Sequence, residues 1–198
     1  MVHRMTRDRY LSDAELARFM GAVGSRRHKN QPRDHAFFAL LSNTGIRPSE
    51  AQGLSVRDVR KVQGKTCIMV DRARRPYSGH PVTEIVLNAQ VVTVLRRFMT
   101  QMPKGDCNRK LFPFTRRQSR RLFHYYRKLA GIAHPYRIYS LRHTVGMRLW
   151  RFTRDIRLIQ ALLGHQRMKA TAAYVHVAPE RLQAAIEQSA EILGGANA

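Results

Sequence analysis

The chain has 198 residues, 43% of them hydrophobic, which is long enough and apolar enough for one globular domain with a real core and excludes a disordered tail. Its 36 Lys and Arg residues against 13 Asp and Glu give a formal net charge of +23, so a polyanion, and nucleic acid first of all, is the expected partner. The basic residues are spread through segments that also carry core periodicity, which argues against an amphipathic helix lying on an anionic membrane.

The cysteines and the N-terminal residues indicate the expected compartment. Cys67 and Cys107 have neither CxxC nor Cys/His ligand spacing, so the sequence predicts neither a disulfide framework nor a structural zinc site. Residues 1–10 form a basic arm, followed by a polar segment rather than by the apolar core of an export signal. The longest apolar run, "AFFALL", is too short to cross a membrane. A cytoplasmic location is therefore expected.

The first predicted elements in chain order are two helices. Ser12, with Glu15 three residues later, forms a capping-box pattern, and apolar residues at helical spacing follow it. Asp34 is the expected cap of a second helix through "HAFFALLSN", which ends at Gly45.

A third helix, two strands and a fourth helix follow. Pro48 occupies a first helical position, so Arg47 is expected at a turn that leads into a helix N-terminus. Residues 65–72 and 81–88 are predicted to be strands, joined by a loop rich in Arg, Pro and Gly. Residues 89–102 have apolar residues in line on one helix face.

The most basic stretch, residues 109–128, is predicted to contain a helix with two different faces. Inward-facing positions are assigned to Leu122, Phe123, Tyr126 and Leu129, while Arg116, Arg120 and Arg127 recur with His124 at helical spacing on the other side. A solvated surface is the alternative, but no acidic residue lies between residues 107 and 154 to compensate the charge. A DNA-facing helix is therefore favoured. The candidate DNA-binding residues are Arg116, Arg117, Arg120, Arg121 and Arg127.

Two more helices place further candidate site residues. Residues 140–150 should form a helix capped by Ser140, which puts Arg142 in the first turn. A cation there opposes the helix dipole, and a bound anion would remove the conflict. Asp155 should cap the next helix and Gly164 should end it, so that His165 lies just past the helix end.

Tyr174, nine positions after His165, is in ordinary cases a core residue with its hydroxyl satisfied at the rim. Together with Arg47, Arg142 and His165, however, Tyr174 makes up a set of residues that suits phosphoryl transfer. Phosphoryl transfer needs positioned cationic donors, which two arginines and a histidine supply, and a tyrosine hydroxyl is a competent covalent nucleophile. The alternative route, two metal ions on clustered carboxylates, needs acidic residues that this chain scarcely has.

Four motifs, in this order and spacing, resemble those of the tyrosine recombinases, the phage integrase family, which includes fimbrial phase-variation recombinases of about this size. The motifs are "NTGIRPSEAQGL", "YSLRHTVG", "LLGH" and "TAAYVHV". The resemblance implies a mainly α fold with a small antiparallel β-sheet. It also implies cleavage and rejoining of DNA strands through a 3′-phosphotyrosine, without a metal or other cofactor. The residues that take the family's catalytic places are Arg47, Arg142, His165 and Tyr174.

The sequence departs from the family pattern at two catalytic positions. Tyr139 stands where the family usually has a histidine, and a tyrosine, with its reference pKa of about 10, is a poorer proton shuttle. The family also has a lysine after the second strand, whereas no lysine occurs here between Lys65 and Lys104. Arg74 is the nearest equivalent and Arg75 the next, although a guanidinium holds its proton tightly. These departures would fit slow catalysis, a different residue acting as the general acid, or a protein whose active site has degenerated.

The resemblance also predicts the domain organisation and the partners. We expect a basic arm (1–10), a catalytic domain (11–180) and a C-terminal helix and tail (181–198), with a fragment of a longer protein as the alternative. The tail helix either packs on its own core or docks on a neighbouring protomer. The expected partners are double-stranded DNA, further copies of the chain on DNA (dimer to tetramer) and DNA-bending accessory proteins, in the bacterial cytoplasm at the nucleoid.

Three functions remain open from the sequence. The first is a site-specific DNA recombinase, and integration, inversion and resolution are not distinguished. The second is a noncatalytic or degenerate DNA-binding protein on the same scaffold, for which the two departures are the warrant. A basic RNA-binding or ribosome-associated protein is the third.

Overall fold

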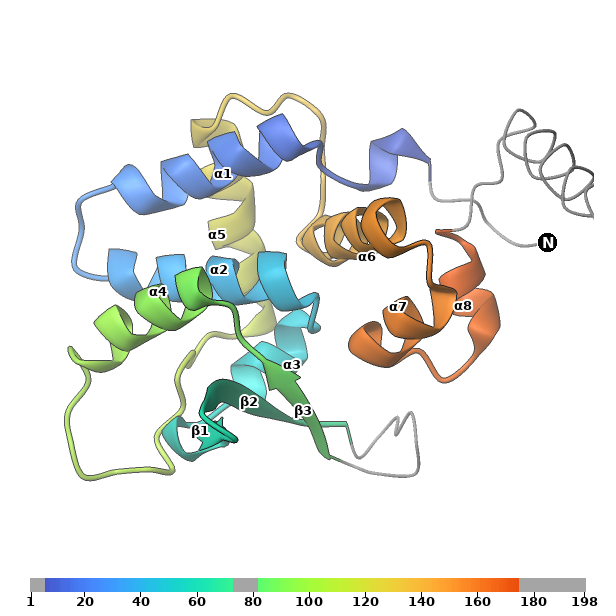
Figure 1. The fold of residues 1–198 in the computed structure, drawn as a ribbon. Helices are drawn as coiled ribbons and strands as arrows, with labels where there is room; N and C mark the ends of the chain where they lie inside the picture. Colours follow the sequence, from blue (N-terminus) through green and yellow to red (C-terminus); the bar gives the residue numbers. More distant parts are fainter. Residues whose placement is uncertain (1–5, 73–81, 175–198) are drawn as a thin grey trace, which may run out of the picture.

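The computed structural model describes residues 6–72 and 82–174, and most of them lie in helices, as predicted (Figure 1). One small antiparallel sheet, in the order β1-β2-β3, completes the mainly α fold that the sequence predicted. The helices are α1 (Asp13–Ser25), α2 (Gln31–Thr44), α3 (Pro48–Gly53), α4 (Ala89–Met99), α5 (Arg116–Leu129), α6 (Tyr139–Thr153), α7 (Ile156–Leu163) and α8 (Met168–Ala172), with short 3-10 turns at Arg7–Arg9 and Val56–Asp58.

The sheet contains one strand that was not predicted from the sequence. β2 (Lys65–Asp71) and β3 (Val82–Val86) were predicted, but β1 (Val59–Val62) also pairs with β2. The two-residue turn between β1 and β2 has positive φ at both Gln63 and Gly64, 47° and 77°. Such a turn matches the twist of a hairpin, and a polar residue followed by Gly is its usual signal.

Local capping signals predicted several helix ends correctly. Ser12 and Glu15 form the expected capping box at α1. Pro48 lies at the start of α3, Asp155 caps α7, and Gly164 ends it in the left-handed conformation. These signals act within a few residues of the chain, which is why they can be read without knowledge of the tertiary structure.

Two predicted caps are wrong. α2 begins at Gln31, so Asp34 lies inside the helix, where it is fully buried and accepts a hydrogen bond from the Tyr126 hydroxyl at 2.9 Å. Its carboxylate joins α2 to α5 instead of capping α2. α6 begins at Tyr139, one residue before Ser140, and its N-cap position, Ile138, makes no side-chain cap hydrogen bond.

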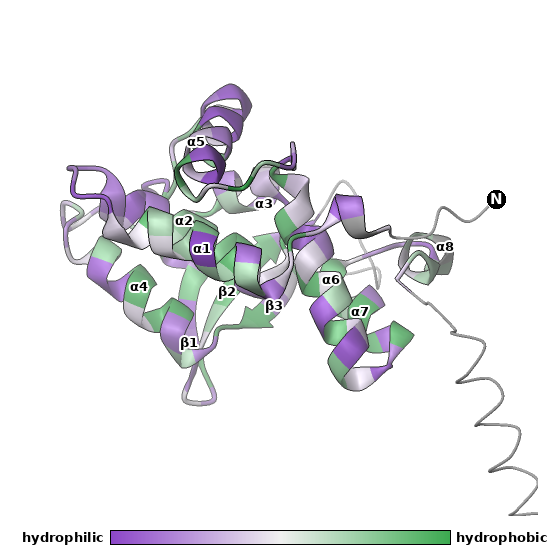
Figure 2. Cartoon of the chain, turned by 90° about the horizontal axis from the view of Figure 1, so that it is seen from above, coloured by the Kyte–Doolittle hydropathy of each residue, from purple (hydrophilic) through white to green (hydrophobic). Residues whose placement is uncertain are grey.

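The main core surrounds α2, which contacts α1, α3, α4 and α6. α2 is buried on almost every side, with seven consecutive buried residues from Ala36 to Ser42, and a helical segment buried all round belongs inside a core. Phenylalanine rings fill the space around it, with Phe37 and Phe38 in edge contact with each other at 5.2 Å. By contrast, the ribbon of α5 is coloured mostly as hydrophilic (Figure 2).

A second, smaller core lies where α6, α7 and α8 pack together at one end of the molecule (Figures 1 and 2). Its buried members are Tyr10, Met147, Ile159, Leu163 and Tyr174. We call these five residues the second cluster and the larger group around α2 the first cluster. None of the helices in the described ranges has the length and apolar character needed to cross a membrane.

Candidate active site

Arg47 is held at the start of α3 by a carboxylate one turn further on. Its backbone N–H donates to Glu50 at 2.6 Å, and its Nη1 donates to the same carboxylate at 2.5 Å. The side chain remains 19% exposed. Glu50 therefore fixes Arg47 at the helix N-terminus, where the sequence placed it, and leaves part of the guanidinium accessible.

Arg142 lies in the first turn of α6 and is almost completely buried. Its guanidinium donates to the carbonyl oxygen of Gly45 at 2.6 Å and to that of Leu163, and so it joins the ends of α2 and α7. A Cβ on Gly45 would come within 2.7 Å of Leu163, so this junction requires a glycine. Burial, and then the nearby positive charge of Arg47, lowers the pKa of Arg142 to about 10. Arg142 is therefore still cationic at neutral pH.

His165 follows the left-handed Gly164 at the end of α7, as predicted. Its Nδ1 lies 2.9 Å from the Thr171 hydroxyl of α8. Burial, followed by the positive charge of Arg142, lowers the pKa of His165 to about 4. The imidazole is therefore neutral at neutral pH, and it offers a hydrogen-bond donor or acceptor rather than a charge.

Tyr174 lies just after α8 and is only 1% exposed. Its ring is parallel to that of His165, with ring centroids 6.3 Å apart. It packs so closely on α6 that a Cβ on Gly146 would come within 2.6 Å of the ring. Burial raises the pKa of Tyr174 to about 12. Tyr174 is thus packed as a core residue, and it also lies beside the polar side chain of His165.

Three residues of this site were not predicted from the sequence: Glu50, Arg72 and His143. The Tyr174 hydroxyl hydrogen-bonds with Nδ1 of His143 at 3.1 Å, and burial followed by the charge of Arg142 lowers the pKa of His143 to about 4. Arg72 lies one residue after β2, with its Nε 3.6 Å from Glu50. Glu50 was detectable as the acidic residue of the first turn of α3. The positions of Arg72 and His143 relative to the site depend on tertiary packing.

The two residues at which the sequence departs from the family are placed differently. Tyr139 is the first residue of α6, and its side chain is 44% exposed. Arg74, with its neighbour Arg75, lies outside the described residues, as does the predicted tail helix. The roles of Tyr139 and Arg74 therefore stay predictions.

Of the five candidate DNA-binding residues on α5, four are exposed, so that DNA binding by them stays a prediction, and the fifth was placed wrongly. Arg116, Arg117, Arg120 and Arg121 are exposed. Arg127 is buried, and its Nη1 donates to three backbone carbonyls, of Ile132, Ala133 and His134, at 2.6, 3.0 and 2.6 Å. It stabilises the turn after α5, where backbone carbonyls lack partners within the helix. Leu129, predicted to face inward, is 52% exposed.

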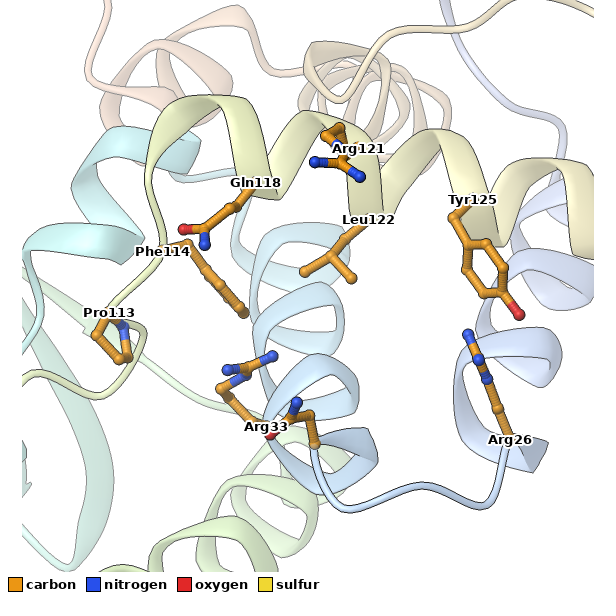
Figure 3. Close-up of a pocket in the computed structure, with 9 residues that line it drawn as sticks. Arg26, Arg33, Pro113, Phe114, Gln118, Arg121, Leu122 and Tyr125 are labelled. Atoms are coloured by element: carbon orange, nitrogen blue, oxygen red, sulfur yellow. The ribbon is translucent and has the colours of Figure 1, made fainter.

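A pocket beside α5 extends this basic surface (Figure 3). Two arginines lie over aromatic rings, Arg26 over Tyr125 and Arg33 over Phe114, each 4.4 Å from the ring centroid. Arg121 also lines the pocket, together with the apolar Leu122. The pocket therefore combines guanidinium groups with flat apolar surfaces, a combination that suits nucleic acid.

The cluster around Arg142 is rich in cations. Arg47, Arg72 and Arg142 lie in electrostatic range of one another, and Glu50 is the carboxylate that they share. In the part of the chain that the structure describes, no three His, Cys, Asp or Glu side chains gather closely enough to hold a metal ion. Guanidinium N–H groups with a neutral histidine form a donor set that suits phosphate oxygens.

Residues 9–181 match the model of the phage integrase family, so this chain belongs to that family. XerD, a tyrosine recombinase of Yersinia pestis, is 32% identical over 162 residues, which cover 76% of this chain and 52% of XerD. XerC, a tyrosine recombinase of Halalkalibacterium halodurans, is 28% identical over 162 residues, or 77% of this chain and 53% of XerC. The chain thus spans about half the length of these relatives.

This chain has the same fold as a catalytic domain of known structure, and the match covers nearly all of that domain. The catalytic domain of bacteriophage HP1 integrase has a TM-score of 0.62 and 20% identity, and the match covers 90% of this chain and 94% of that domain. At this identity the likeness concerns the fold alone. It agrees with the family assignment and with the mainly α architecture.

Proposed function

We propose that this protein is a site-specific DNA recombinase that cuts and rejoins DNA strands through a 3′-phosphotyrosine at Tyr174. The observation that carries the proposal is the meeting of Arg47, Arg142, His165 and Tyr174, which come from separate segments, in one buried cluster. The sequence expected these four residues to act together, and an apolar core alone gives no reason for two arginines and a histidine beside a tyrosine.

The chemistry is a transesterification. The Tyr174 hydroxyl gives up its proton as its oxygen forms a bond to phosphorus, the bond from phosphorus to the 5′ oxygen breaks, and the departing 5′ oxygen takes up a proton, so the step neither gains nor loses a proton overall. Arg47 and Arg142 donate to the non-bridging oxygens, where negative charge develops, and His165 adds a neutral donor. The tyrosine–phosphate bond conserves the energy of the phosphodiester. A 5′ hydroxyl of a second strand then reverses the step without a nucleotide cofactor.

Tyr174 has to move before it can attack. It is almost fully buried, and its hydroxyl is bound to His143. A buried phenol with a raised pKa is a poor nucleophile, because attack requires loss of the proton. DNA binding therefore has to release the hydroxyl from His143 and bring it to the phosphate.

The DNA duplex contacts the exposed face of α5. Arg116, Arg117, Arg120 and Arg121 are uncompensated cations on that face, and the pocket lined by Arg26 and Arg33 continues it. Contacts of this kind bind phosphates of any sequence and release counterions, so the affinity depends steeply on salt. In support of a DNA substrate, the structurally similar XerH recombinase, with a TM-score of 0.75 and 20% identity over 94% of this chain and 55% of that chain, was solved bound to its difH substrate.

Assembly and cellular context belong to the same proposal. Strand exchange needs two DNA sites, so we expect the chain to act as a dimer or tetramer on DNA, through the segment 181–198 and with the help of DNA-bending proteins. We expect it to work at the nucleoid in the bacterial cytoplasm, and DNA inversion and integration are both compatible with the chemistry.

A covalent-trapping experiment tests the function. Footprinting of the DNA on both sides of the protein's own gene identifies a bound site. A nicked duplex of that site then loses a short 5′ fragment after cleavage, so that rejoining is prevented. The wild type should accumulate a protein–DNA adduct that resists SDS, whereas Tyr174→Phe should bind the same DNA and form none. A wild type that binds its site and gives no adduct would establish the noncatalytic DNA-binding function instead.

A further inference from the structure

Arg72 carries hydrogen-bonding capacity that its surroundings do not use. Its side chain is completely buried, and its Nη2 donates to the carbonyl oxygen of Leu162 at 3.1 Å. Among the described residues, Nε and Nη1 have no hydrogen-bond partner, although Nε lies 3.6 Å from Glu50. Buried guanidinium N–H groups without acceptors are costly, so an arginine retained in this state is suited to a ligand that supplies an acceptor.

The unused donors of Arg72 lie beside the catalytic residues. A Cβ on Gly164 would clash with Nη1, which puts this nitrogen against the backbone immediately before His165. Arg72 donates to Leu162 and Arg142 to Leu163, so the two guanidinium groups bind consecutive carbonyls at the end of α7. The same short segment thus positions both guanidinium groups and the catalytic histidine.

The charges of the cluster leave room for an anion. Burial lowers the pKa of Arg72, Glu50 opposes that effect, and the positive charge of Arg47 adds to it. Among the described residues, three guanidinium groups share the Glu50 carboxylate, which leaves two positive charges uncompensated. A phosphodiester brings one negative charge, and the five-coordinate transition state brings about two. The negative charge of the transition state therefore balances both positive charges of the cluster. The bound substrate balances one of them, and the empty site leaves both unbalanced.

We propose that Arg72 is a third phosphate-binding arginine, whose Nη1 donates to a non-bridging oxygen of the phosphate that Arg47 and Arg142 hold. This inference rests on the proposed function for its reaction, but it makes its own claim about anion binding. Arg72 keeps its proton throughout the reaction, and only the acceptors of its hydrogen bonds change.

The first test measures anion binding without any chemistry. In the Tyr174→Phe background, thermal unfolding is followed while inorganic phosphate is added, with Arg72→Met to remove the charge and Arg72→Gln to remove the charge but keep a donor for Leu162. Phosphate should raise the Tm of Tyr174→Phe, because a ligand of the folded state stabilises it. The rise should be much smaller in both double variants. Arg96→Met, at an exposed arginine of α4 outside the DNA-binding surface, is the matched control and should keep the full rise.

The second test measures cleavage with Tyr174 restored. Arg72→Gln should slow single-turnover adduct formation by roughly a hundredfold to a thousandfold, as the loss of one oxyanion donor does, while DNA affinity stays within about threefold. A purely structural Arg72 would instead lower the Tm and reduce binding and cleavage together.

The outcomes separate this proposal from the proposed function. If phosphate stabilises the Arg72 variants as much as it stabilises the parent, or if both variants fail to fold, Arg72 is a structural residue and the proposal is overturned. If phosphate binding needs Arg72 but the wild type forms no adduct, the anion site stands and the recombinase function falls.

Discussion

The first and second clusters differ in the chemistry of their side chains and of their neighbours. The first cluster is filled mostly by aliphatic and phenylalanine side chains around α2, with ring contacts such as Phe37 to Phe112 at 5.2 Å, and one of its buried phenols, Tyr126, donates to the Asp34 carboxylate. The second cluster includes a buried phenol, Tyr174, and it adjoins the buried guanidinium of Arg142 and the half-buried His165. Apolar burial stabilises a fold, whereas burial of polar groups costs free energy unless each finds a partner.

Because of this difference, we expect the first cluster to determine mainly the stability of the fold and the second cluster mainly the reaction. Substitutions in the first cluster should change the free energy of unfolding and leave the reaction intact in the molecules that fold. Substitutions in or beside the second cluster should change pKa values, the position of Tyr174 and the reaction rate. Polar residues elsewhere provide a further contrast, because α5 carries one buried arginine and several exposed ones.

The largest effect on stability should come from the first cluster. Phe37 is fully buried, and Phe37→Ala should lower the free energy of unfolding by about 3–5 kcal/mol, because it removes apolar burial and leaves a cavity. Urea unfolding followed by circular dichroism measures the change. Phe152 is 90% exposed, so Phe152→Ala should stay within about 0.5 kcal/mol of the wild type. Equal losses in the two variants would mean that α2 is not the centre of the core.

Next in size is the contrast between two arginines of α5. Arg127→Met should cost about 2–3 kcal/mol, because the backbone carbonyls of the following turn lose a charged donor. It should leave the salt dependence of DNA binding nearly unchanged. Arg120→Met is the matched control, which should keep the stability and lower the slope of log affinity against log salt by about 0.9. The reverse pattern would restore Arg127 to the DNA-binding surface.

A smaller effect is expected at the contact between α6 and Tyr174. Gly146→Ala puts a methyl group within 2.6 Å of the ring, which should cost about 1–3 kcal/mol and displace Tyr174 from His143. Adduct formation should change as well, because the proposed nucleophile is shifted. A Cβ on Gly21 of α1 would meet nothing within 4 Å, so Gly21→Ala should leave the adduct unaltered. Normal activity and stability in Gly146→Ala would show that Tyr174 is loosely held.

The smallest effect should appear in the pH dependence of stability. Burial lowers the pKa of His143 from 6.5 to about 4, so between these values the unfolded chain binds the proton more readily than the folded one. This histidine therefore contributes stability above pH 6.5 that is lost as the pH falls toward 4. His143→Gln should show a smaller drop in Tm over that window than the wild type. His124→Gln, at an exposed site on α5, should show the full drop. Identical curves for His143→Gln and the wild type would place His143 in water.

Much of the site was predictable because its signals are local. Pro48 and Glu50 position Arg47 through one turn of helix, and Asp155 with Gly164 delimits α7 and so delivers His165. Such signals depend on backbone groups a few residues away, and tertiary packing does not override them here.

The wrong and missed residues share a different cause. Asp34 and Arg127 carry charge and lie in helical sequences, yet each is buried because it has a hydrogen-bond partner on another element or on the following turn. Arg72 and His143 joined the site through contacts with α7 and with Tyr174, which lie far away in sequence. Spacing along the chain carries no information about such partners.

The most direct test of Tyr174 as the nucleophile is to identify the residue to which the DNA becomes covalently attached. The trapped adduct is digested with nuclease and trypsin, and mass spectrometry then locates the residual nucleotide. Cleavage after Lys169 and Arg181 releases the peptide 170–181, in which Tyr174 is the single tyrosine. We expect the nucleotide on that peptide, at Tyr174. A nucleotide on Tyr139, or on any residue outside 170–181, would contradict the proposed mechanism.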